Sequence, residues 1–337
     1  MPICFDPRLR LGQPAMMGQG DPDGKEDDPP HPLDLPSLCS QPSYNTLISL
    51  FSKITPPPPS WTTNPSPSQI QHNYTPWLTR LISTPMPWLS ESEAETITSM
   101  ASTSLALRAG RTAAPDMLRA FDVEGHDIEL FEPSWTGDSV GHKTWAASLL
   151  LAQRLSSMYM VSTSPFLKAS IGGRCLGLGE GTGLLGIAAV KVMAWTVTLT
   201  DLPGITGNLK KNVQRNCSER SEVRELDWRD PPSHEVIPFG SFDIVIGSDL
   251  FYEAEHSWMV IAMVERYLRR DSESRFIVAY PLRALHLKEI TDFEERAGKR
   301  FDVEAFGEEI GVEDWGSEVV CRWSIYKWKL KHQQQRH

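Results

Sequence analysis

Residues 176–183 read Leu-Gly-Leu-Gly-Glu-Gly-Thr-Gly, a short apolar segment that runs directly into glycines at alternate positions. Glycine has no Cβ, so it allows the backbone to turn sharply and to pass close to a ligand. The apolar residues that follow are typical of a helix over 183–192. A strand, a glycine turn and a helix in this order predict a ligand-binding loop in an α/β fold.

The segments around this loop alternate between strand-like and helix-like patterns. Residues 242–247 are almost continuously apolar, as expected for a strand that is buried on both faces. The expected strands cover residues 174–178, 197–200, 242–247 and 276–280. The expected helices cover residues 145–155, 183–192, 205–216 and about 258–268. This alternation predicts a Rossmann-like α/β fold, with a doubly wound parallel sheet and helices on both of its faces.

The glycine loop by itself leaves two classes of ligand open. Residues 181–186 also fit the pattern G-x-G-x-x-G of dinucleotide-binding proteins, so hydride-transfer enzymes remain an alternative. None of the seven tyrosines is followed by lysine four residues later, a pair that a short-chain reductase would use. A glycine turn without any ligand is disfavoured, because three glycines cost backbone entropy.

Two acidic residues follow the next strands of the predicted sheet. Asp201 ends the second strand, 18 residues after Gly183, which is close to the offset of about 20 at which an acid reaches ribose hydroxyls. Asp227 and Trp228 follow the next expected strand position. There a carboxylate can meet an adenine amino group and an indole can cover the base, although a buried core tryptophan is the alternative. These residues favour a nucleoside ligand.

A further acid lies at the end of the buried strand that begins at residue 242. The stretch 242–252 reads Phe-Asp-Ile-Val-Ile-Gly-Ser-Asp-Leu-Phe-Tyr, so Asp249 falls at the carboxyl end of the strand, with Tyr252 three residues later. Ligands of parallel sheets bind at this edge. Asp249 either caps a helix or faces a substrate, and the glycine loop upstream favours the substrate.

Composition excludes several classes of protein. A net charge of -10 argues against a general affinity for nucleic acid. The longest mostly apolar stretch, 184–199, falls short of the ~18 residues of a membrane span. Five scattered cysteines form no metal-binding pattern and favour a reducing compartment. We expect a soluble, cytoplasmic monomer with a protein or small-molecule partner, no metal and no membrane contact.

The chain divides into regions of different composition. Eighteen of the 26 prolines lie in the first 87 residues, so residues 1–70 are expected to be largely disordered. Residues 75–115 are expected to form a helical accessory region, with a helix start at residues 90–93. This region is either a brace for the main domain or a contact for the substrate. Alternation between residues 121 and 130 predicts a hairpin, which opens the main domain at 120–330.

Five motifs in order resemble the seven-β-strand protein-lysine methyltransferases of methyltransferase family 16. They are residues 141–145, 176–187, 200–203, 226–228 and the D-x-x-Y box at 249–252. The resemblance covers about residues 120–330. Residues 101–113 are similar to the fungal members that methylate translation elongation factors.

The resemblance implies a fold, a cofactor and a substrate. The fold is the seven-stranded class I methyltransferase sheet, with an N-terminal helical and hairpin extension. The cofactor is S-adenosylmethionine, and the acceptor is a lysine of a protein, with a translation elongation factor as the expected partner. Asp249 and Tyr252 would hold the acceptor lysine. The expected cofactor-binding residues are Trp145, Gly179, Glu180, Gly181, Gly183, Asp201, Asp227, Trp228 and Ser248.

The sequence departs from the family pattern at one position. Gly177 stands where the family usually has Glu or Asp, a residue that helps to bind the methionine end of the cofactor. This departure predicts either weaker cofactor binding or compensation by a neighbour such as Glu180. The motif Asn-Pro-Pro-Tyr of amide and adenine methylation is absent after the strand that begins at residue 242. A small-molecule N-methyltransferase and a non-catalytic interaction protein on the same fold remain the alternatives.

Overall fold

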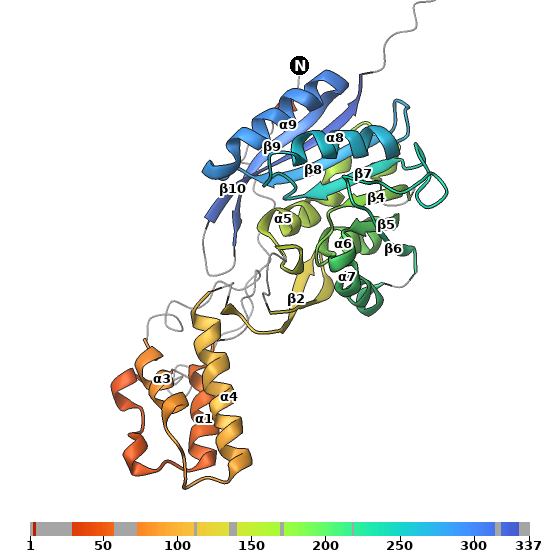
Figure 1. Cartoon of the computed structure of the whole chain (residues 1–337). Helices are drawn as coiled ribbons and strands as arrows, with labels where there is room; N and C mark the ends of the chain where they lie inside the picture. The colour runs from red at the N-terminus through yellow and green to blue at the C-terminus, as the bar shows by residue number, and fades with distance from the viewer. Residues whose placement is uncertain are drawn as a thin grey trace, which may run out of the picture. The chain divides into compact units, whose positions relative to one another are not determined.

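The chain folds into two compact units (Figure 1). The larger unit comprises Met1–Asp6, Leu118–Glu132 and Thr136–His337, and the smaller unit comprises Pro7–Met117 and Pro133–Trp135. A computed structural model describes residues 3–4, 29–56, 73–110, 113–134, 140–168, 172–217, 219–313 and 318–329.

The larger unit is built on one twisted sheet. Its strands are β1 (Ile3–Cys4), β4 (Arg174–Leu178), β5 (Thr196–Asp201), β6 (Ser221–Glu225), β7 (Ile244–Ser248), β8 (Arg275–Pro281), β9 (Phe301–Val312) and β10 (Glu318–Trp328). Within the described residues their order is β1-β9-β10-β8-β7-β4-β5-β6. The strands from β8 to β6 are parallel, and β10 is antiparallel to both β8 and β9. Apart from the two-residue β1, these strands confirm the predicted seven-stranded sheet.

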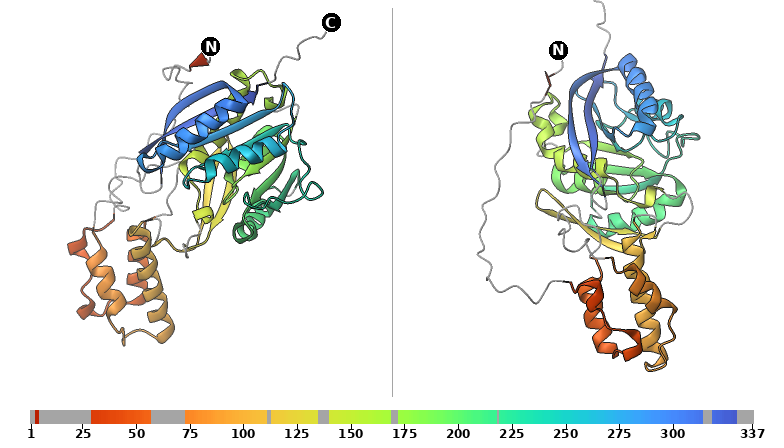
Figure 2. Two further views of the ribbon diagram at one scale, coloured as in Figure 1. Left: turned by 45° about the horizontal axis from the view of Figure 1, so that its top comes forward. Right: turned by 90° about the vertical axis from the view of Figure 1, so that its left-hand side faces the viewer.

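Helices cover both faces of the sheet (Figures 1 and 2), as the sequence predicted. The helices are α5 (Ala146–Arg154), α6 (Leu184–Met193), α7 (Pro203–Asn216), α8 (His256–Tyr267) and α9 (Leu287–Arg300). Helices α8 and α9 pack against each other and form a core with one face of β4, β7, β8 and β10. Helices α5, α6 and α7 lie on the other face. Every residue of β8 is buried, because both of its faces are covered.

A separate hairpin of β2 (Met117–Val123) and β3 (His126–Glu132) confirms the predicted hairpin. Buried and exposed residues alternate strictly along β2. The hairpin is held to α7 by side-chain amides, since the backbone N–H of Phe131 donates to Asn212 Oδ1 at 2.8 Å and that of Glu129 donates to Asn216 Oδ1 at 2.9 Å.

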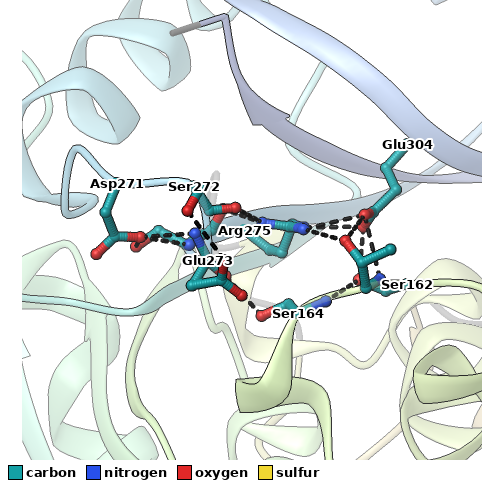
Figure 3. Close-up of polar contacts among 9 residues, drawn as sticks. Ser162, Ser164, Asp271, Ser272, Glu273, Arg275 and Glu304 are labelled. Carbon is teal, nitrogen blue, oxygen red and sulfur yellow. Dashed lines mark hydrogen bonds and ion pairs between the residues drawn. The ribbon is translucent and has the colours of Figure 1, made fainter.

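A buried ion pair joins β8 to β9 (Figure 3). The Arg275 guanidinium donates to both carboxylate oxygens of Glu304, at 2.8 and 3.0 Å, and Thr163 and Ser162 complete the network. Burial acts to raise the pKa of Glu304, but hydrogen bonds from Arg275, Ser162 and Thr163 outweigh it and hold the pKa at about 2. The ion pair therefore ties the hairpin of β9 and β10 to β8. The acidic sequence of β9 gives little indication of a strand.

The smaller unit contains α1 (Tyr44–Ile54), α3 (Thr75–Ser83) and α4 (Glu91–Arg108), which enclose an apolar core of their own. Ser90 and Glu93 form a capping box at the start of α4, where the sequence predicted a helix start. The expected disorder over 1–70 does not describe residues 29–56, because Leu47, Phe51 and Ile54 give α1 a face that is buried in this core. Residues 1–2, 5–28 and 57–70 of that expected tail lie outside the described residues.

None of the helices in the described ranges is long and apolar enough to cross a membrane.

Candidate active site

A cleft of about 450 Å³ lies at the carboxyl ends of the parallel strands. The loops after β4, β5, β6, β7 and β8 line it, together with the segment that leads into α5. Ten of the eleven residues singled out from the sequence lie on its wall: Trp145, Gly179, Glu180, Gly181, Asp201, Asp227, Trp228, Ser248, Asp249 and Tyr252. The structure thus brings together residues that are more than 100 positions apart in the chain.

The glycine loop after β4 requires glycine at two positions that face the cleft. Gly179 and Gly181 have φ angles of +59° and +58°, in the left-handed region that other residues rarely adopt. A Cβ at Gly179 would lie 2.9 Å from Leu250, and one at Gly181 would lie 3.0 Å from the carbonyl oxygen of Gly141. Glycine at both positions therefore allows the loop to pack closely against Leu250 and the Gly141 backbone.

Gly183 lies at the start of α6. It does not line the cleft. It is the N-cap of α6, with a φ of +94°, and a Cβ there would lie 2.6 Å from Leu209 of α7. Its lack of a side chain allows α6 and α7 to pack closely, so its contribution to a ligand site is indirect.

Asp201 ties the end of β5 to the glycine loop. Its Oδ2 accepts a hydrogen bond from the Gly181 N–H at 2.7 Å, and its Oδ1 accepts one from the Leu202 N–H at 2.7 Å. Burial raises the pKa of Asp201 to about 6, although these two hydrogen bonds act to lower it. A carboxylate that is held in this way is well placed for the hydroxyl groups of a ligand in the cleft.

The carboxyl group of Glu180 folds back over β4. Its Oε2 accepts a hydrogen bond from the Gly186 N–H in α6 at 2.9 Å. Its Oε1 is buried and accepts no hydrogen bond from the described residues. A Cβ on Gly177 would lie 1.9 Å from this oxygen. An acid three residues later in the chain therefore fills the space of the side chain that Gly177 lacks.

Burial is the main reason why the pKa of Glu180 is raised to about 8. The hydrogen bond from Gly186 opposes this shift, and the negative charge of Asp201 adds to it. In the absence of a ligand the Glu180 carboxyl group is therefore largely protonated at neutral pH. Its buried, unpartnered oxygen is suited to a hydrogen-bond donor or a cation.

Aromatic rings line the cleft next to the glycine loop, where Trp228 lies beside Gly179. The Trp228 and His256 rings meet edge to face with centroids 5.5 Å apart, and the Tyr252 and His256 rings do so at 4.4 Å. Burial lowers the pKa of His256, so its imidazole is neutral at physiological pH. Trp145 donates from Nε1 to the Val140 carbonyl oxygen at 3.1 Å, which fixes its indole at the start of α5.

Asp249 follows β7 with a strained backbone. Its φ is +55°, and its N–H donates to the Ala279 carbonyl oxygen of β8 at 2.8 Å. The neighbouring Tyr252 has a pKa of about 12, raised by burial and then by the charges of Asp201, Glu253 and Asp249. Its hydroxyl group is therefore neutral and can donate or accept a hydrogen bond, but it cannot serve as a base at neutral pH.

Arg283 and His256 are among the cleft residues that sequence reasoning did not single out. Arg283 lies two residues after the end of β8, so the argument that singled out Asp249 at a strand end applies to it equally. His256 begins α8, four residues after Tyr252, and its ring contacts the Tyr252 ring.

The cleft fits a sulfonium nucleoside. The two glycines form a tight loop at the wall of the cleft, an acid ends β5 beside it, and the Trp228 indole lies next to Gly179. The volume falls within the range of about 300 to 1,000 Å³ of small-molecule sites. Together with the order of the strands, these features are those of an S-adenosylmethionine-dependent methyltransferase.

Comparison with known proteins narrows this class. Residues 124–296, just over half of the chain, match the family model described as lysine methyltransferase. The chain belongs to the lysine methyltransferase family. It is an S-adenosylmethionine-dependent protein-lysine N-methyltransferase, and its substrate is a protein.

Three relatives illustrate the extent of the similarity. The chain is 35% identical over 308 residues to protein-lysine N-methyltransferase rrg1 of Schizosaccharomyces pombe, which covers 88% of this chain and 97% of the relative. It is 32% identical over 231 residues to protein-lysine N-methyltransferase EFM2 of Saccharomyces cerevisiae, a match that covers 62% of this chain and 54% of the relative. It is 31% identical over 139 residues to protein N-lysine methyltransferase METTL21A of Danio rerio, a match that covers 40% of this chain and 58% of the relative.

Proposed function

We propose that Asp249 and Tyr252 hold the acceptor lysine, and that the loop through Gly179 and Gly181 holds the cofactor beside it. The observation that carries this proposal is that both sets of residues line one cleft. Because the cleft lies at the carboxyl edge of the sheet, the two substrates can meet there.

The cofactor-binding roles follow from the chemistry of each side chain. Asp201 accepts hydrogen bonds from the ribose hydroxyls and Asp227 accepts one from the adenine amino group, while Trp228 covers the base. Ser248, Trp145 and Glu180 surround the methionine part of the cofactor. The cofactor, when bound, supplies an electrophilic methyl group, and no metal takes part in the proposed reaction.

The lysine must lose a proton before it can accept the methyl group. A free lysine has a pKa of about 10.4, so its neutral form costs roughly 4 to 5 kcal/mol at pH 7. Asp249 attracts the charged form of the side chain and aims it into the cleft, with the Tyr252 hydroxyl as a second contact. Positioning of the two reactants then supplies much of the rate acceleration.

The proposed acceptor is a translation elongation factor in the cytoplasm. Support comes from the similarity of residues 101–113 to fungal enzymes with such substrates; residues 101–108 lie in α4, and 111–112 lie outside the described residues. In this proposal residues 120–330 form the catalytic domain of a monomer, residues 75–115 form an accessory region, and nucleic acid is not a substrate.

Labelling identifies the acceptor. The purified chain is incubated with S-adenosylmethionine that carries a labelled methyl group and with a fungal extract, and the labelled protein is identified by mass spectrometry. One labelled elongation factor, modified on a lysine, is expected. A labelled small molecule without any protein acceptor, or no transfer at all, would contradict the proposal.

A further inference from the structure

Arg283 stands beside Asp249 at the edge of the cleft. The two residues follow adjacent parallel strands, β8 and β7, and Arg283 Nη2 lies 3.4 Å from Asp249 Oδ2. The same Nη2 contacts the carboxylate of Glu313, and the guanidinium lies 5.2 Å from the centroid of the Trp145 ring. The arginine is thus held between two carboxylates and an indole.

The charges around Asp249 are mostly negative. Asp201, Glu253, Glu309 and Glu313 face this corner from different elements, together with the neutral groups Tyr252 and Cys321 and the histidines 256 and 286. Arg229 lies in the cleft but pairs with Glu253 and Glu255, at 3.5 and 3.8 Å, and the buried Lys143 also lines the cleft. Arg283 therefore offsets the charge of Asp249 at close range.

A carboxylate alone is a poor neighbour for an amine that must react. It favours the ammonium form, which has no lone pair for the methyl group. A cation that shares the carboxylate opposes this preference without removing the hydrogen-bond acceptor that aims the side chain. The contact between Arg283 and Asp249 provides such a cation on the wall of the acceptor site.

We propose that Arg283 is a positioning residue that shares Asp249 with the incoming lysine and thereby keeps the lysine amine able to lose its proton. This inference rests on the proposed role of Asp249. Arg283 acts through the carboxylate rather than on the cofactor.

Glu313 provides a second position at which a substitution changes the contact between Arg283 and Asp249. It binds the same Nη2 atom that approaches Asp249, so it draws part of the arginine's charge away from the acceptor site. Removal of the Glu313 charge leaves Arg283 more fully engaged with Asp249. The two substitutions Arg283→Gln and Glu313→Gln should therefore act in opposite directions.

A bisubstrate ligand tests the role of Arg283 without knowledge of the acceptor protein. The probe is an S-adenosylhomocysteine analogue in which a nitrogen replaces the sulfur and carries an aminopropyl chain, so that its amine stands in for the lysine. Its affinity for the full chain is measured by calorimetry near pH 7, in two buffers that differ in ionisation enthalpy. S-adenosylhomocysteine, which lacks the amine, is the matched control.

We expect Arg283→Gln to bind the amine probe about tenfold more tightly than the wild type, which corresponds to one unit in the amine pKa, with less proton release on binding. Arg283→Lys should retain wild-type behaviour, and Glu313→Gln should bind the probe several-fold more weakly. Because Arg283 also contacts Trp145, each probe affinity is compared with the affinity of the same variant for S-adenosylhomocysteine.

The inference is wrong if Arg283→Gln binds the amine probe no more tightly than the wild type. If that variant does not fold, an unchanged probe affinity in Glu313→Gln overturns the inference instead. A wild-type chain that fails to bind S-adenosylhomocysteine contradicts the proposed function itself. If the wild type binds this control normally and the variants do not change the affinity for the amine probe, only the role of Arg283 is wrong.

Discussion

The carboxyl group of Glu180 occupies the space above Gly177 that a side chain at that position would need. A Cβ on Gly177 would lie 1.9 Å from Glu180 Oε1, so the two positions cannot both carry large side chains. The departure of the sequence from the family pattern at Gly177 is thus matched by an acid at Glu180, which reaches the same face of β4. This exchange makes the two positions energetically dependent on each other.

The close contact between positions 177 and 180 predicts that a second substitution at Glu180 restores the ligand binding that a substitution at Gly177 weakens. Gly177→Glu alone should displace Glu180 and weaken the binding of S-adenosylhomocysteine by at least about tenfold, since neighbouring substitutions couple by about 0.5 to 3 kcal/mol. The double variant Gly177→Glu with Glu180→Ala should recover most of that loss. Calorimetry on the single and double variants measures the coupling, and additive losses would show that the two positions are independent.

The raised pKa of Glu180 predicts that this residue lowers the stability of the fold as pH rises. Its pKa is about 8 in the folded chain, whereas the ordinary pKa of a glutamate side chain is 4.5, so the folded state binds the additional proton and loses stability as pH rises between these values. Without ligand, Glu180→Gln should therefore gain stability over the wild type as pH rises from about 5 to about 9. Chemical denaturation across this range measures the difference, and a constant difference would argue against a protonated Glu180.

Asp249 should be needed for transfer but not for cofactor binding. Asp249→Ala removes the carboxylate that captures the lysine, so methyl transfer to the acceptor protein should be lost. The affinity for S-adenosylhomocysteine should stay within a few-fold of the wild type. Filter binding of the labelled acceptor and calorimetry provide the two readouts, and normal turnover by this variant would refute the assignment.

Asp201 should show the opposite pattern. Asp201→Ala removes the acceptor for ribose hydroxyls and the anchor of the Gly181 N–H. Cofactor affinity should fall by about tenfold or more, since a hydrogen bond to a charged group contributes about 1.5 to 3 kcal/mol. The ribose role fails if calorimetry finds the affinity unchanged.

The ion pair between Arg275 and Glu304 should stabilise the fold. Glu304→Gln leaves the buried Arg275 without its counter-charge, which typically costs about 3 to 5 kcal/mol. Because the pKa of Glu304 is lowered to about 2, its contribution is present above about pH 4.5 and is lost as pH falls through about 2. Urea denaturation at several pH values should show the variant and the wild type converging in acid.

The parts of the fold that the sequence predicted are those with a local signal. The glycine loop around Gly181 and the buried strand before Asp249 carry their signal within about ten residues, so their places at the sheet edge could be predicted. The position of β9 could not be predicted, because its glutamates 304, 308 and 309 hide the apolar pattern. Their partners, Arg275, Arg322 and Arg154, are distant in the chain.

The site shows the same division. Asp201 and Asp249 end strands, and this placement is visible in the sequence. The roles of Glu180 and Arg283 depend on contacts that only the folded chain creates: a carboxyl group that folds back over a glycine, and a guanidinium that reaches across from the neighbouring strand. The helix α1 escaped prediction for a related reason, because the prolines around it masked its apolar face.

The most direct test of the shared cleft is a crystal structure of the chain with the aminopropyl bisubstrate analogue. The account predicts the ribose against Asp201, the base beside Trp228, and the amine within hydrogen-bond distance of the Asp249 carboxylate. An analogue that binds with its amine directed away from Asp249, or with its nucleoside outside the glycine loop, would contradict it.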